Sequence, residues 1–226
     1  NLAIRHSPDL VVGAESADDI SEAVRFAAAN GLKVSVQATG HTESTITSGL
    51  LLTTKRMDGF DVDPAEKTVT AGPGVQWQPV IAAAAEHGLA PIAGSSPMVG
   101  IVGYLTGGGL GPLVRSHGFS SDNLIEATVV TGSGEVVTAS ADENQDLLWA
   151  LRGGKYGLGI VTSVKVRLAE LDTIYAGSLF FSEEDIETAL RGWIDWTADA
   201  DERVSTSAAV MQFPPFEAVP EPLRGR

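Results

Sequence analysis

Seven glycines fall within one stretch of eighteen residues, Gly94-Ser95-Ser96-Pro97-Met98-Val99-Gly100-Ile101-Val102-Gly103-Tyr104-Leu105-Thr106-Gly107-Gly108-Gly109-Leu110-Gly111. Where side chains are missing, consecutive backbone N–H groups can point into one concavity, and such a concavity suits the oxygens of a pyrophosphate. A single glycine-rich loop more often marks an ordinary turn. The stretch therefore indicates a ligand only if the rest of the chain supports one.

That support comes from two further glycine-rich loops, residues 38–42 (ATGHT) and 152–159 (RGGKYGLG). The stretch 94–111 itself holds two loops, residues 94–103 and 107–111, so the chain has four glycine-rich loops in all. Four such loops favour a large cofactor that contains phosphate. The common nucleotide motifs are absent: no GxGxxG opens a helix after the first strand, and Tyr156 follows Lys155 where a P-loop needs Ser or Thr.

Composition narrows the class of protein. The chain has 226 residues, 43% hydrophobic and 19% charged, which is typical of a globular protein. Its formal charge of −14 disfavours nucleic acid and membrane surfaces as partners. No apolar run approaches the ~20 residues of a membrane-spanning helix. We expect a soluble protein, either cytoplasmic or secreted, whose oligomeric state the sequence does not determine.

The residue types also exclude several kinds of site. The absence of cysteine excludes disulfides, thiolate nucleophiles and cysteine zinc sites. The four histidines are scattered singly along the sequence, so we expect no metal site.

Hydrophobic periodicity and turn signals predict an α+β fold. The expected strands are residues 10–12, 33–36, 50–54, 68–71, 123–131, 135–139, 160–168, 174–181 and 204–213, and the expected helices are residues 16–30, 79–87, 143–151 and one capped by Ser182. Ser16 and Asp19 form a capping-box pattern for the first helix, and Gly31 is suited to end it. We place a domain boundary at about residue 170, with two subdomains at about 1–89 and 90–170.

Over roughly residues 5–170, the order of these motifs resembles the flavin-binding half of the vanillyl-alcohol-oxidase superfamily, most closely the berberine-bridge-enzyme-like oxidases. Four segments carry the resemblance. Residues 36–42 resemble the family motif Arg-x-Gly-Gly-Gly-His-Ser, and residues 94–111 are nearly the complete signature Gly-x-Cys/Ser-Pro-x-Val-Gly-x-x-Gly with Gly-Gly-Gly-x-Gly. Residues 115–123 resemble Arg-x-x-Gly-Leu-x-x-Asp-Asn, and residues 144–154 with 159–162 match the closing signature of the family. Ala38 and Thr39 replace two glycines of the first segment. Ser96 replaces the cysteine that bonds the flavin C6 in bicovalent members, and Gly157-Leu158 replaces Asn-Phe.

The resemblance implies a PCMH-type FAD-binding domain of two α/β subdomains in residues 1–170. Residues 171–226 would begin an α+β substrate domain, since family members run to about twice this length. The chain is therefore expected to be incomplete. We expect the beginning of that domain to expose apolar residues such as Leu179, Phe180 and Phe181, and so to favour association.

The resemblance also implies FAD as the cofactor, attached through His41 to the flavin 8α-methyl group. A neutral imidazole is nucleophilic near pH 7, although a lone loop histidine more often makes only a local hydrogen bond. The residues expected to hold FAD are Gln37, Ala38, Thr39, Gly40, His41, Thr42, Gly94, Ser95, Ser96, Val99, Gly100, Val102, Gly103, Gly107, Gly159, Ile160 and Val161. Val99 matches the position of the family's oxygen gatekeeper, whereas Ile160 and Val161 also suit a plain core strand. Tyr104 suits either the core or the flavin.

The expected function is an FAD-dependent oxidase. It would take a hydride from an alcohol-type substrate, a sugar or a secondary metabolite, to flavin N5, and oxygen would reoxidise the flavin. A dehydrogenase with another acceptor, or a flavin-binding module without turnover, remains an alternative. The partners are then a small-molecule substrate and oxygen, and the catalytic base is expected outside this chain.

Overall fold

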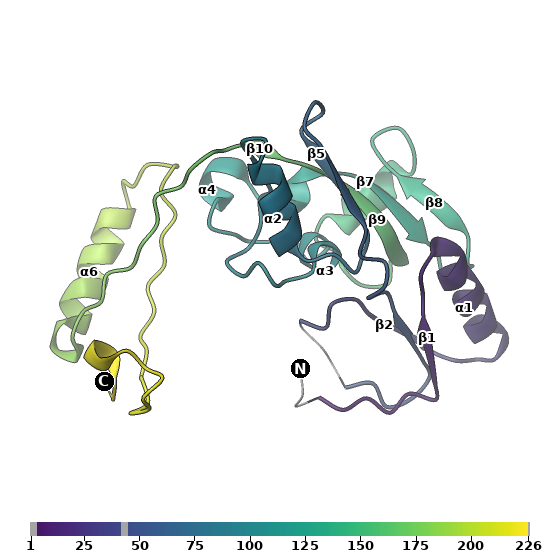
Figure 1. The fold of residues 1–226 in the computed structure, drawn as a ribbon, viewed down its shortest axis with the longest axis horizontal. Coiled ribbons are helices and arrows are strands. Elements are labelled where there is room, and N and C mark those ends of the chain that lie inside the picture. The colour runs from purple at the N-terminus through teal and green to yellow at the C-terminus, as the bar shows by residue number, and fades with distance from the viewer. Residues whose placement is uncertain (1–3, 42–44, 226) are drawn as a thin grey trace. The chain divides into compact units, whose positions relative to one another are not determined.

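The computed structural model describes residues 4–41 and 45–225 (Figure 1). The chain divides into two compact units, an N-terminal unit that ends at Asp172 and a C-terminal unit that begins at Thr173. Within the described residues, no helix combines the length and the apolar character needed to span a membrane.

The N-terminal unit opens with a parallel three-stranded sheet in the order β1-β3-β2, formed by β1 (Leu10–Gly13), β3 (Leu50–Thr53) and β2 (Val34–Gln37). Helix α1 (Ala17–Ala29) connects β1 to β2 and buries Ile20, Val24 and Ala27. Because β3 lies between the two other strands, its Leu50 and Leu52 are almost fully buried. These residues form the core of the first half of the unit.

The two ends of α1 follow the sequence prediction. The Ser16 hydroxyl accepts a hydrogen bond from the Asp19 N–H at 3.1 Å, and the Asp19 carboxylate accepts one from the Ser16 N–H at 3.1 Å. Gly31 has a φ of +65°, the left-handed conformation that glycine adopts without strain. The predicted capping box and the predicted stop are confirmed.

The larger sheet is antiparallel and has the order β4-β5-β9-β7-β8 (Figure 1). Its strands are β4 (Phe60–Asp63), β5 (Thr68–Ala71), β9 (Ile160–Arg167), β7 (Leu124–Val130) and β8 (Val136–Ala139). Strands β4 and β5 precede residue 89 in the chain but join this sheet through the pairing of β5 with β9. The sheet therefore takes strands from both sides of the boundary expected near that residue.

Three helices pack with this sheet in one hydrophobic core: α2 (Trp77–Ala85), α3 (Ile101–Leu105) and α5 (Gln145–Leu151). Trp77 and Ile101 are completely buried in it. At the ends of β7 and β9, the paired residues Val130 and Ile160 pack instead into the core of α1 and β3. The two sheets thus meet at this pair, and the mixed arrangement confirms the predicted α+β class.

Short elements complete the N-terminal unit. Strands β6 (Leu89–Ala90) and β10 (Ala169–Glu170) pair antiparallel, and α4 (Val114–His117) and the 3₁₀ turn η1 (Ser120–Asn123) lie between α3 and β7 in the chain. The sequence did not predict β4, α3 or α4, since each is short and α3 carries a glycine.

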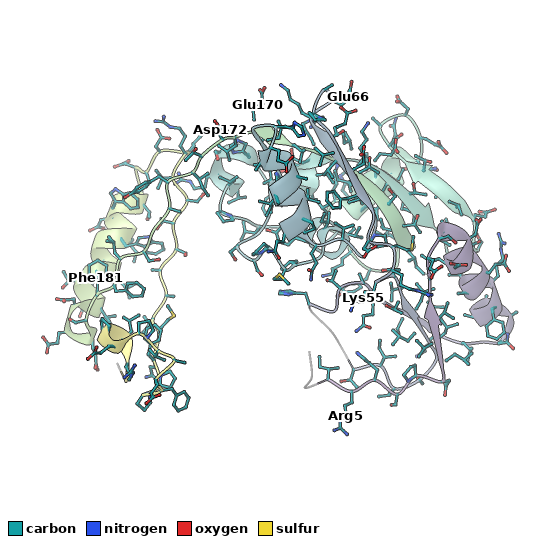
Figure 2. All side chains as sticks on the ribbon, in the orientation of Figure 1. Arg5, Lys55, Glu66, Glu170, Asp172 and Phe181 are labelled. Carbon is teal, nitrogen blue, oxygen red and sulfur yellow. The ribbon has the colours of Figure 1, made fainter. Side chains whose placement is uncertain are left out.

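The C-terminal unit contains η2 (Glu183–Asp185), α6 (Ile186–Thr197) and η3 (Glu221–Leu223), and no strand forms in residues 173–225. The strands predicted at 174–181 and 204–213 are therefore wrong. A strand needs a partner for its backbone groups, and here none forms. Leu179, Phe180 and Phe181, the last labelled in Figure 2, are exposed as predicted.

The helix expected after Ser182 forms, but its predicted cap does not. The Ser182 hydroxyl donates to the Asp185 carboxylate at 2.8 Å, and it accepts no capping bond from the helix backbone. The regular α-helix begins only at Ile186.

Candidate cofactor site

The glycine-rich loops at residues 38–42 and 94–103, the first and second in chain order, meet where α3 begins. A Cβ added to Gly100 would lie 2.6 Å from Thr39 Oγ1 and 2.7 Å from Thr39 Cγ2, so the Thr39 side chain occupies the space above Gly100. Only glycine allows so close an approach. The contact joins residues 61 positions apart and brings together two loops that the sequence predicts to share one ligand.

The backbone of the second loop is fixed by the segment that begins α2. Four hydrogen bonds do this: Trp77 N–H to Val99 O (3.1 Å), Gln78 N–H to Pro97 O (2.8 Å), Gln76 Nε2 to Met98 O (2.7 Å), and Ile101 N–H to Val75 O (3.0 Å). Sequence reasoning missed this support, because no motif or spacing links residues 75–78 to residues 97–101.

Helix α3 presents one side without side chains. Gly100, Gly103 and Gly107 are spaced i, i+3 and i+7, which places them on one side of α3 and the turn that follows it. We call these three residues the glycine face. A Cβ added to Gly103 would meet no atom within 4 Å. Gly103 and Gly107 are exposed, so the glycine face offers open backbone to a ligand at these two positions, whereas Gly100 is covered by Thr39.

The opposite side of α3 is core, and Gly94, Gly109 and Gly111 close around Tyr104. A Cβ on Gly94 would lie 2.9 Å from Tyr104 Oη, and one on Gly109 would lie 2.8 Å from Tyr104 Cε1. The Tyr104 ring packs edge-on against Trp77, with 6.2 Å between centroids, and burial raises the pKa of the Tyr104 hydroxyl. Of the two roles that the sequence allowed for Tyr104, the structure supports the core.

The fourth glycine-rich loop, residues 152–159, reaches the end of the glycine face at Gly107. Lys155 Cδ and Nζ would lie 3.5 and 3.6 Å from a Cβ on Gly107, so this side chain packs over Gly107. The loop is anchored by Arg152, whose guanidinium donates two hydrogen bonds, of 2.6 and 3.1 Å, to Leu124 O. Lys155 belongs to a predicted glycine-rich loop, but the sequence did not single it out as a site residue.

The segment after this loop enters β9. Gly159 has a φ of +110°, and a Cβ on it would lie 2.6 Å from Val129 Cγ1, so this position requires glycine. Ile160 and Val161 pair with Val130 and Val129 in the sheet, and their side chains pack into the two cores. The core-strand interpretation of these two residues is thus correct, and their contact with a cofactor stays a prediction.

Further predicted site residues lie in the loops at residues 38–42 and 94–103. His41 is exposed at the end of the described part of the first loop, and Thr42 lies outside the described residues. Ser95 is exposed, Ser96 is half-buried, and Val99 is half-buried against the main core. A cradle of bare backbone, closed by Thr39 at one end and Lys155 at the other, fits an elongated ligand with phosphate groups such as FAD.

Comparisons with known proteins point to one family. A family model for an FAD binding domain matches residues 8–140. The (R)-6-hydroxynicotine oxidase of Paenarthrobacter nicotinovorans is 38% identical over 167 residues, which cover 73% of this chain and 36% of that protein.

Solved structures agree. A glucooligosaccharide oxidase from Acremonium strictum matches with a TM-score of 0.77 and 27% identity, covering 90% of this chain and 44% of that one. Another structure of that enzyme, which concerns the roles of its 6-S-cysteinyl, 8α-N1-histidyl FAD, gives a TM-score of 0.70 and 32% identity, covering 75% and 37%. The chain thus spans less than half the length of these relatives.

Proposed function

We propose that this chain, which belongs to the FAD-binding domain family and to the vanillyl-alcohol-oxidase superfamily of FAD-linked oxidases, holds the FAD of an oxidase for alcohol-type substrates. The observation that carries the proposal is the contact of Thr39 with Gly100, which joins the first loop to the glycine face. Two loops that hold one ligand must lie near each other, and this contact brings residues 38–42 beside the glycine face.

The proposed assignments follow the loops. Residues 37–42 hold the pyrophosphate from one side, and residues 94–103 with Gly107 hold its other side and the flavin ring. Gly159, Ile160 and Val161 offer main-chain groups to the adenine end. Val99 lies beside the reactive flavin carbon as the oxygen gatekeeper. The four bonds from residues 75–78 support this arrangement, because they fix the loop that carries Val99.

The chemistry is divided between cofactor and protein. FAD, when bound, supplies the hydride acceptor, and oxygen then restores its oxidised form. The protein binds and orients it, and the His41 imidazole is the proposed point of covalent attachment. A histidyl FAD in the Acremonium strictum oxidase supports this role for His41.

The test of His41 is acid precipitation of the purified protein. We expect the flavin to remain in the pellet, to appear in the supernatant for His41→Ala, and to stay in the pellet for the control His87→Ala, which changes an exposed histidine just after α2. Peptide mapping should find a single flavin-bearing fragment, containing His41, because the chain has no cysteine for a second linkage. Flavin lost from the unmutated protein, or a second flavin peptide around residues 94–100, would contradict the assignment.

The class of reaction is tested by adding sugars and secondary alcohols in the absence of oxygen and following the visible absorbance of the flavin, which bleaches when the flavin is reduced. In a full-length relative that carries this domain, bleaching with recovery in air indicates an oxidase, and bleaching without recovery indicates the alternative, a dehydrogenase. For residues 1–226 alone we expect FAD to bind without turnover, since no residue among 173–225 is buried to wall a substrate pocket. Rapid reduction by this chain would show that its catalytic groups lie within it.

A further inference from the structure

The two ends of the glycine face are closed by side chains of different character. Thr39, a neutral hydroxyl residue, covers Gly100, whereas Lys155 lays its Cδ and its ammonium over Gly107. Gly103 lies between them with open space above it. A ligand along this face would therefore meet the positive charge of Lys155 at the end formed by residues 152–159.

Among the residues that the structure describes, no carboxylate forms an ion pair with Lys155. In the described residues, the ion pairs of the chain join Arg25 to Glu22, Arg56 to Glu15, Lys67 to Glu170, Arg191 to Glu187 and Arg203 to Asp201. Lys155 takes part in none of them, and the contact that the structure shows for its ammonium is the Tyr156 ring, 5.7 Å from Nζ to the centroid. In a chain of net charge −14, an ammonium left over bare backbone is available for an anion.

FAD has such an anion in its pyrophosphate, the part of the molecule that is charged in every redox state. An acidic protein repels this group at long range, and backbone amides contribute only partial charges. An ammonium–phosphate hydrogen bond is charge-assisted, and lysine commonly provides it. We propose that Lys155 Nζ binds the pyrophosphate of FAD, an inference that rests on the proposed function.

The backbone of Lys155 gives a variant that separates binding from folding. Lys155 has a φ of +53°, a conformation that costs a lysine energy and costs glycine almost nothing. Lys155→Gly therefore should leave the melting temperature unchanged or raise it, while it removes the charge. A residue with only a structural role would not give a stable protein with weakened FAD binding.

The experiment uses the 226-residue chain with His41→Ala, so that FAD binding is reversible and can be followed by quenching of flavin fluorescence. We expect Lys155→Gly and Lys155→Met to weaken FAD binding by about tenfold to a hundredfold, as for loss of one hydrogen bond to a charged group. The matched control Lys33→Met removes the same charge from an exposed site and should change binding less than twofold. The loss should shrink as salt rises, because salt screens the pair.

A second measurement, chemical acylation of lysines with and without FAD, tests the contact between Lys155 and FAD directly. Acetic anhydride should acylate Lys155 and Lys33 in the free protein, and FAD should protect Lys155 alone. Equal affinities of the Lys155 variants and the Lys33 control, or equal acylation of Lys155 with and without FAD, would overturn the inference. If the His41→Ala chain bound no FAD while its fold was intact, the proposed function would fail and this inference with it.

Discussion

Helices α1 and α6 have almost the same length, 13 and 12 residues, and both are amphipathic, but they end in different environments. In the N-terminal unit, α1 buries Ile20, Ala23, Val24 and Ala27 against β3 and Val130. In the C-terminal unit, α6 has no buried residue, and its Ile194 and Trp196 are 59% and 54% exposed. The same periodicity thus describes a core helix in one unit and a helix without a fully buried residue in the other.

The difference shows what a local pattern can and cannot specify. A helix satisfies its backbone within its own segment, so α6 forms although its apolar side is only partly covered. A strand must bond to another strand, so the apolar segments 174–181 and 204–213 stay irregular. In the N-terminal unit, by contrast, even the four-residue β4 forms, because β5 pairs with it.

The largest expected effect comes from removing one tryptophan in each unit. Trp77 is completely buried, so Trp77→Ala should reduce the free energy of unfolding by about 3–5 kcal/mol. Trp196→Ala should change it by less than about 0.5 kcal/mol, since that side chain is mostly exposed. Urea unfolding followed by far-ultraviolet circular dichroism measures both.

If Trp77→Ala does not fold, Trp77→Phe gives the same comparison on a smaller scale. It keeps a ring against Tyr104 and removes the indole N–H, which is buried without a hydrogen-bond partner among the described residues. Equal losses for the Trp77 and Trp196 variants would show that the C-terminal unit has a cooperative core of its own, and the comparison would fail.

The second prediction concerns two helix glycines. An added Cβ meets no atom within 4 Å at either Gly103 in α3 or Gly192 in α6. Replacement by alanine should therefore stabilise either helix, by up to about 1 kcal/mol. Gly103→Ala should nevertheless weaken FAD binding at least tenfold, because its methyl group stands on the glycine face, while Gly192→Ala should leave it unchanged.

Fluorescence titration of FAD in the His41→Ala chain, with melting curves for both variants, measures this prediction. A Gly103→Ala protein that is stable and binds FAD normally would show that the ligand does not approach α3. The assignment of the glycine face would then be wrong even if the protein binds FAD elsewhere.

These cases also show how far the sequence predicts the fold. The capping box at Ser16 and the strand β9 were predictable because their signals are local: a hydroxyl three residues before a carboxylate, and alternation of apolar with polar residues. The order of the glycine motifs predicted the family. The predicted strands of the C-terminal unit failed because alternation or apolar content says nothing about whether a partner strand exists.

The candidate site also has features that the sequence predicted and features that it did not. Each loop was visible in the sequence as a cluster of glycines, but the contacts between loops were not. The close approach of Thr39 to Gly100 and of Lys155 to Gly107 depends on how the loops pack, and no spacing encodes it. Thr39 even reads as a departure from the family motif, whereas in the structure its side chain is the contact that joins the two loops.

The smallest expected effect compares the two helix starts, which share the pattern Ser-x-x-Asp. At α1 the pattern forms a reciprocal capping box, and at Ser182 it forms only a side-chain pair with Asp185. Ser16→Ala should therefore cost about 1 kcal/mol of the free energy of unfolding. Ser182→Ala should cost much less, since no helix N–H loses an acceptor.

The pH dependence of α1 sharpens this last prediction. Hydrogen bonds from the backbone N–H of Glu15 and then from the Ser16 side chain and backbone hold the pKa of Asp19 below its ordinary value of 3.8. A carboxyl whose pKa is lower in the folded chain stabilises the fold above pH ~4, and that contribution is lost as the pH falls through the folded pKa. Asp19→Asn removes the titrating carboxyl, so its stability should approach that of the unmutated chain as the pH is lowered from 6 to 3. Urea unfolding at each pH gives the difference between the two proteins, and a difference that stays constant over this range would show that the Asp19 carboxylate does not stabilise α1.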